Sequence, residues 1–389
     1  MSEIEHSASD QPSVEELTLQ AVAASQRLLE THPQPAQYRP ELLPPVTHES
    51  YFGGEVKVIE AAPVDPLTGE AIKTDKLDVY YAHGAGWAQE EPTVQEMARL
   101  GRIAFAMDFT GARLADARFV IGHTELGNTA SLQDATDKEV AASLGELGGI
   151  VPRQQMREAA TLLGLIAERV SQDAAVGRID AVFQSESAGH GLIAAYTHPE
   201  VFHNIVLAFP GSLSGPQIGF IPLRIAKDGM VRRQHRPSPD NDFRSQDQLG
   251  PAASIRMQLK SPGFKEDAAA LRYSALAWML HSIRQREGAP GVTLVAGLDD
   301  KIFELEGYLN SLVASTDIDR IVVVPGGHAI GGRKDVLATV MGQFPAMEAD
   351  RARGPLRDRI LLPANTPVER TEKIMALADE VDRRSAETP

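Results

Sequence analysis

The chain contains no cysteine among its 389 residues. This absence excludes disulfide bonds, thiolate metal sites and a cysteine nucleophile, although it leaves the redox compartment undetermined. The sequence also lacks an uninterrupted apolar run of the ~18 residues that span a bilayer. Its first six residues have neither the basic segment nor the apolar segment of a signal peptide. We therefore expect a cytoplasmic protein that does not act in a membrane.

Basic residues are outnumbered by acidic ones, with 38 Lys and Arg against 53 Asp and Glu and a formal net charge of -15. Nucleic acids and anionic membranes are themselves polyanions, so this charge argues against both as partners. A hydrophobic content of 43% is enough for a full core. No motif for a metal or an organic cofactor stands out, and we expect neither group.

Short apolar runs with β-branched or aromatic members recur along the chain and predict β-strands. They lie at residues 56–59, 77–81, 103–107, 181–183, 205–209, 292–296 and 321–324. Such runs are continuously apolar, as strands of a sheet covered on both faces are. Helical patterns alternate with them, most clearly over residues 154–170. The pattern predicts an α/β fold with a doubly wound, mostly parallel sheet.

Residues 184–189, Gln-Ser-Glu-Ser-Ala-Gly, follow an apolar run at 179–183 and precede a helical pattern. This is the layout of a nucleophile elbow, in which a serine sits on a strained turn between a strand and a helix. Such a turn needs small residues two positions away on each side. If Ser187 is the nucleophile, Ser185 and Gly189 are these small residues. If Ser185 were the nucleophile, Phe183 would occupy the cramped position. We therefore predict Ser187 as the nucleophile.

Partners for this serine follow other predicted strands. The run at 292–296 leads into Asp300, and the run at 321–324 leads into His328. Upstream, the run at 77–81 leads into residues 83–87, His-Gly-Ala-Gly-Trp, a glycine-rich loop of the kind that supplies an oxyanion donor. The chain order is thus loop, serine, aspartate, histidine.

That order and those positions resemble the α/β-hydrolase family over residues 76–214 and 286–344. The resemblance implies that Ser187 is the nucleophile, Asp300 the orienting acid and His328 the base. It also implies that the backbone N–H groups of Ala85 and Ala188 form the oxyanion hole. Two residues depart from the usual pattern: Ser185 stands where the family most often has glycine, and Ala85 interrupts the glycines of its loop.

Two neighbouring carboxylates compete for the role of the acid. We favour Asp300 over Asp299 because the family's acid usually lies three residues after the glycine that ends the strand, here Gly297. Among the remaining histidines, we expect His83 to brace the loop and His190 to pack on the helix.

The rest of the chain is divided around this core. Residues 1–75 are expected to form an N-terminal extension with a helix at 14–30, a proline-rich connector and the first strand. Residues 215–285 are expected to form a helical cap over the substrate pocket, and residues 345–389 a tail with a helix at 368–384. This tail either straps the core or contacts another copy in a homo-oligomer.

The function favoured by these residues is hydrolysis of a carboxylic ester of a small or medium apolar molecule through an acyl-enzyme. Two alternatives stay open at this stage. An acyltransferase would use the same three residues, and a non-catalytic binding protein would keep the scaffold without the chemistry.

Overall fold

The computed structural model describes residues 44–51, 56–65, 68–82, 90–107, 154–174, 177–185, 187–211, 213, 224, 227–228, 275–328, 333–349 and 354–387. The predicted helix at 14–30, the glycine-rich loop at 83–87 and most of the predicted cap at 215–285 lie outside these residues. None of the described helices is both long and apolar enough to cross a bilayer.

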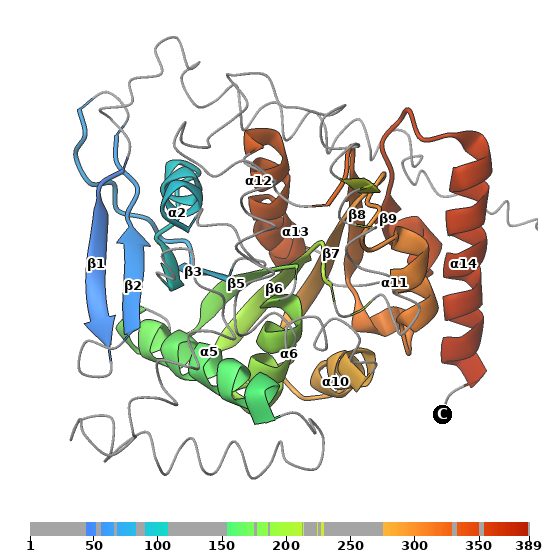
Figure 1. The fold of residues 1–389 in the computed structure, drawn as a ribbon, viewed down its shortest axis with the longest axis horizontal. Coiled ribbons are helices and arrows are strands. Elements are labelled where there is room, and N and C mark those ends of the chain that lie inside the picture. Colours follow the sequence, from blue (N-terminus) through green and yellow to red (C-terminus); the bar gives the residue numbers. More distant parts are fainter. Residues whose placement is uncertain are drawn as a thin grey trace, which may run out of the picture. The chain divides into compact units, whose positions relative to one another are not determined.

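A nine-stranded sheet forms the centre of the described residues, in the order β1-β2-β4-β3-β5-β6-β7-β8-β9 (Figure 1). β1 and β2 pair antiparallel, as do β2 and β4, and the other strands pair parallel. The fold class predicted from the sequence is confirmed. The strands are β1 (Val46–Tyr51), β2 (Val56–Ala61), β3 (Val79–Ala82), β4 (Ala104–Met107), β5 (Ile179–Gln184), β6 (Phe202–Ala208), β7 (Gly291–Gly297), β8 (Arg320–Val324) and β9 (Ile360–Leu361).

Helices cover both faces of this sheet (Figure 1). One face packs against α5 (Gln154–Asp173), α6 (Ser187–Thr197), α10 (Ala275–Arg284), α11 (Leu305–Ser311) and α14 (Val368–Glu387). The other packs against α2 (Glu90–Arg99), α12 (Lys334–Met341) and α13 (Gln343–Ala349). Short 3₁₀ helices at Ser315–Asp317 and Leu356–Arg359 complete the described elements.

Each central strand contributes side chains to both layers, because successive residues of a strand point to opposite faces. In β5, Ala181 and Phe183 join the core under α5 and α6, while Val182 joins the core under α2 and α12. In β6, Leu207 joins the first of these layers and Val206 joins the second. This double burial explains why the strands read as continuous apolar runs.

The sequence did not predict the two outermost strands. β1 carries the polar sequence Val-Thr-His-Glu-Ser-Tyr and pairs on one side only, so no apolar run marks it. β9 has two residues, too few for a pattern. The tail helix α14 was predicted, and its Ile374, Ala378 and Val381 are fully buried in the core. In the described chain the tail therefore straps the core.

The strand order changes direction at β3, because β4 lies on one side of it and β5 on the other. In sheets of this kind, ligands bind outside the carboxyl ends of the strands at such a switch point. The carboxyl end of β5 is therefore the place where this fold offers a site.

His190, in the second turn of α6, is buried beneath the sheet with 1% of its surface exposed. Burial lowers its pKa to about 4, so the imidazole is neutral in the folded chain. The prediction that this residue packs on the helix is confirmed.

We expect His190 to make the fold sensitive to acid. Its contribution to the free energy of unfolding is complete above the unfolded-state pKa of about 6.5 and is lost as the pH falls toward 4. The unfolded chain then binds a proton that the folded chain excludes, a loss on the order of 3 kcal/mol. Urea unfolding between pH 7.5 and pH 4 tests this. His190→Gln should flatten the decline, whereas parallel curves for the two proteins would refute it.

Candidate active site

Ser185 occupies the sharp turn between β5 and α6. Its φ of 55° lies in the left-handed region, which a residue with a side chain rarely adopts. The backbone is fixed there because Ser185 N–H donates to the carbonyl of Ala208 at 2.9 Å, and the Ser185 carbonyl accepts from the N–H of Gly211 at 2.9 Å. Tyr81 of β3 donates its hydroxyl to the Gln184 side chain at 2.5 Å, which ties β3 to β5 beside the turn.

The hydroxyl of Ser185 lies against the histidine predicted as the base. Ser185 Oγ and His328 Nε2 are 2.8 Å apart, although the two residues are 143 positions apart in the chain. Ser187, the residue predicted for this place, is instead the first residue of α6 and is 1% exposed. The turn lies at the predicted junction, but the serine that the structure brings to His328 is Ser185, two residues before the predicted Ser187.

The prediction of Ser187 assumed that the small residue must lie on the strand. Phe183 fills the supposedly cramped position, and the room for it comes from the helix. A Cβ added at Gly191 would lie 2.3 Å from Cγ of Phe183. The missing side chain at Gly191 thus lets α6 pass over the phenylalanine ring. The signals in the sequence were this glycine and a strand one residue longer than expected, which places Ser185 directly after β5.

His328 and Asp300 are brought together as a pair. His328 Nδ1 lies 2.8 Å from Asp300 Oδ2, and the carboxylate is fully buried. Asp300 Oδ1 accepts the backbone N–H groups of Ile302 and Phe303, each at 2.8 Å. Since a carboxylate only accepts, this geometry suits the neutral tautomer that carries its proton on Nδ1 and presents the lone pair of Nε2 to Ser185.

The alternative acid, Asp299, points elsewhere. Its carboxylate pairs with Arg370 of α14 at 3.4 Å.

Aromatic rings flank the imidazole of His328. The ring of Phe303 stands edge-on with its centroid 5.0 Å away, and the ring of Phe209 stands edge-on at 5.9 Å. Burial, and then the negative charge of Asp300, raise the pKa of Tyr308 well above its usual value. Its phenol therefore stays neutral beside the carboxylate.

The predicted oxyanion hole is only partly within the described chain. Ala85 lies outside it. The N–H of Ala188 donates to the carbonyl of Ser185 at 3.2 Å, across the turn that leads into α6. The prediction for Ala188 followed from placing the nucleophile at Ser187, and it stays a prediction.

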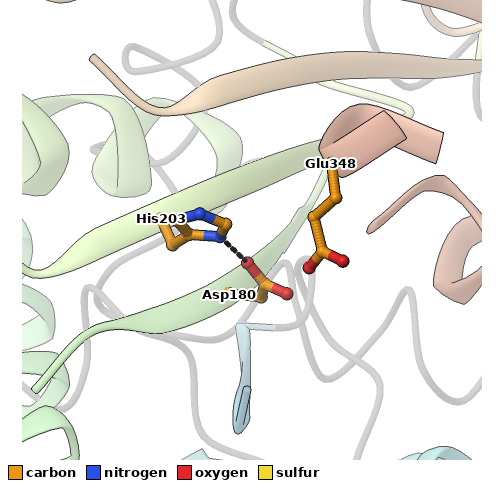
Figure 2. Close-up of side chains that lie close together, drawn as sticks. All are labelled: Asp180, His203 and Glu348. Atoms are coloured by element: carbon orange, nitrogen blue, oxygen red, sulfur yellow. Dashed lines mark hydrogen bonds and ion pairs between the residues drawn. The ribbon is translucent and has the colours of Figure 1, made fainter. Parts of the chain in front are cut away.

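A second group of polar side chains lies at the opposite, amino-terminal ends of the central strands β5 and β6. Asp180, His203 and Glu348 each offer one ligand atom, and these atoms lie within 4.8 Å of one another (Figure 2). Asp180 stands near the start of β5, five residues from Ser185, or roughly 17 Å along an extended strand. Its carboxylate already lies 2.7 Å from Arg102 Nη2 and accepts from Asn204 Nδ2 at 3.1 Å. A cation here would share Asp180 with a guanidinium, which opposes its binding.

The described sheet and its strand ends follow the layout that the resemblance to the α/β-hydrolase family implied: a serine after β5, an aspartate after β7 and a histidine after β8, in that chain order. This likeness is one of strand order and strand-end residues.

Comparison with known proteins gives structural likeness without sequence likeness. No protein-family model matches the chain, and no curated protein sequence matches it. Solved structures similar to it include a bacterial membrane phospholipase A (15% identity, 86% of this chain and 97% of that chain, TM-score 0.40). Others are Est1E from Butyrivibrio proteoclasticus (10%, 78% and 98%, 0.39) and dienelactone hydrolase from Anabaena variabilis (13%, 80% and 100%, 0.40). The chemistry is therefore inferred from the side-chain geometry.

The contact between Gly191 and Phe183 can be tested with a double-mutant cycle. Gly191→Ala should lower the free energy of unfolding by ~1–3 kcal/mol through overpacking, and Phe183→Ala by ~3–5 kcal/mol through the cavity it leaves. In the double variant the new methyl group enters the vacated space, so the loss should fall short of the sum by ~1 kcal/mol or more. Urea unfolding measures all three. Additive losses would mean that the two residues do not compete for space.

Proposed function

We propose that the protein is a serine hydrolase that cleaves a carboxylic ester of a small or medium apolar substrate through an acyl-enzyme on Ser185. One observation carries this proposal: an unbroken hydrogen-bonded series from Ser185 Oγ through His328 to the buried Asp300, with both links 2.8 Å long. A serine hydroxyl needs a neighbouring base to become a nucleophile, and the base needs a group that fixes its tautomer.

Acylation begins with attack of Ser185 Oγ on the ester carbonyl carbon. His328 Nε2 takes the hydroxyl proton as the new C–O bond forms, and the imidazolium is stabilised by the Asp300 carboxylate at Nδ1. The tetrahedral intermediate then expels the alcohol, which receives the proton from Nε2. Water repeats the sequence on the acyl-enzyme, and His328 again accepts and returns the proton.

The negative oxygen of the intermediate needs hydrogen-bond donors near Ser185. The amino end of α6 begins two residues after this serine, so the positive end of the helix dipole is directed at the reacting carbonyl. We propose that the N–H of the residue after the nucleophile, Glu186, which lies outside the described residues, is one donor. The glycine-rich loop at 83–87 is our proposal for the second donor.

The surroundings of the base support an apolar substrate. Phe209 and Phe303 flank the imidazole and are themselves almost fully buried. Apolar walls exclude water from His328 and strengthen the charge stabilisation by Asp300. They also favour a carbonyl compound whose acyl or alcohol part is apolar.

The two serines of the elbow allow a matched test. We expect Ser185→Ala to lose ~10⁴–10⁶-fold in kcat on p-nitrophenyl esters, because no nucleophile then faces His328. Ser187→Ala, which removes a hydroxyl two residues away, should stay within ~10-fold of the wild type. A series of acyl lengths, assayed with all three proteins, also gives the size of the pocket.

The opposite ranking of the two variants would contradict the assignment of the nucleophile. Equal activity of the wild type and Ser185→Ala, with both folded by circular dichroism, would contradict the proposed function itself.

A further inference from the structure

A fourth side chain is built into the site from a distant part of the sequence. Asp228 lies between β6 and α10, and none of its surface is exposed. Its Oδ1 accepts the backbone N–H of His328 at 2.8 Å and that of Lys301 at 3.3 Å. One carboxylate oxygen therefore joins His328, the proposed base, to Lys301, the residue after the proposed acid Asp300.

The glycines of both loops fit around this carboxylate. A Cβ added at Gly327 would lie 2.5 Å from Asp228 Oδ1, so only glycine lets the carboxylate approach the histidine loop. A Cβ added at Gly297 would lie 2.5 Å from the carbonyl oxygen of Gly327, which keeps the two loops in contact. The backbone N–H of Asp299 donates to the carbonyl of Gly326 at 2.8 Å. In the Gly-Gly-His sequence at 326–328, close packing thus explains Gly327, and the proposed chemistry explains His328.

A second contact ties the same segment to the acid loop. Arg224 donates from Nη1 to the carbonyl of Ile302 at 3.2 Å. The N–H of Ile302 in turn donates to Asp300. The segment before α10 is therefore attached to both loops at points next to the proposed catalytic residues.

We propose that Asp228 is a positioning residue for the proposed hydrolase: it sets the distance between His328 and Asp300 by holding the backbone of both loops. The proposal rests on the proposed function. Asp228 acts through main-chain N–H groups and takes no proton in the reaction. Its removal leaves the loops free to shift by a fraction of an ångström, and a misplacement of about 1 Å can lower turnover ~100-fold.

The test compares Asp228→Ala with Asp228→Asn. The asparagine keeps an oxygen at the position of Oδ1 and can still accept both N–H groups, whereas the alanine cannot. We expect Asp228→Ala to lower kcat ~10–100-fold with KM within ~3-fold of the wild type, and Asp228→Asn to recover kcat to within ~5-fold. Lys227→Ala, at the exposed neighbouring position, is the control and should match the wild type.

Titration with a fluorophosphonate separates this role from a general effect on folding. Rates are expressed per titrated serine, so unfolded protein does not enter them. Wild-type kcat per titrated site in Asp228→Ala would overturn the proposal, and so would an Asp228→Asn variant as impaired as the alanine. Should Asp228→Ala fail to fold, Asp228→Ser takes its place, because a serine hydroxyl is too short to reach both N–H groups.

The outcome is distinguishable from failure of the proposed function. Ser185→Ala is measured in the same assays. If it keeps wild-type activity, the hydrolase assignment fails. If it is inactive while Asp228→Ala is unimpaired, only the role of Asp228 is refuted.

Discussion

The hydrogen bond between Ser185 and His328 joins residues that follow two strands three positions apart in the sheet. The rest of the site depends on how the chain brings these two residues together. The serine follows β5 and the histidine follows β8, with β6 and β7 between them. At about 4.8 Å per spacing, the strand ends are roughly 14 Å apart. The loop after β8 therefore has to lean back across the edge of the sheet to reach the serine.

Glycine makes this approach feasible, and backbone hydrogen bonds hold it. Gly326 has a φ of 106°, which turns the chain after β8, and Gly297 lets the loop pass directly over the end of β7. At the end of β5, Ser185 has a left-handed backbone conformation. Hydrogen bonds to the carbonyl of Ala208 and from the N–H of Gly211 hold it in place. The strain is local, whereas the sheet that supports it is buried on both faces.

Much of this arrangement could be predicted from the sequence. Continuous apolar runs marked the central strands, since those strands are buried on both faces, and the residues after β7 and β8 gave Asp300 and His328 as candidates that the structure brings together. The edge strands β1, which is polar, and β9, which has two residues, left no apolar pattern in the sequence. The difference between Ser185 and Ser187 depended on where α6 makes room for Phe183, and that contact joins positions eight residues apart on different elements. A local rule for small neighbours does not contain it.

Asp228 shows the same limit more strongly. Its partners are backbone N–H groups 73 and 100 positions away, so neither side-chain type nor spacing marks it in the sequence. Residues that touch a reacting atom follow strand ends and can be found from pattern, whereas those that hold a backbone in place become visible only in three dimensions.

The assignment of Ser185 as the nucleophile underlies every step of the proposed chemistry. Its most direct test is reaction of the folded protein with a fluorophosphonate, followed by fragmentation of the labelled peptide by mass spectrometry, which resolves Ser185 from Ser187. We expect one adduct per chain, on Ser185. An adduct on Ser187, or no adduct on the folded protein, would contradict it.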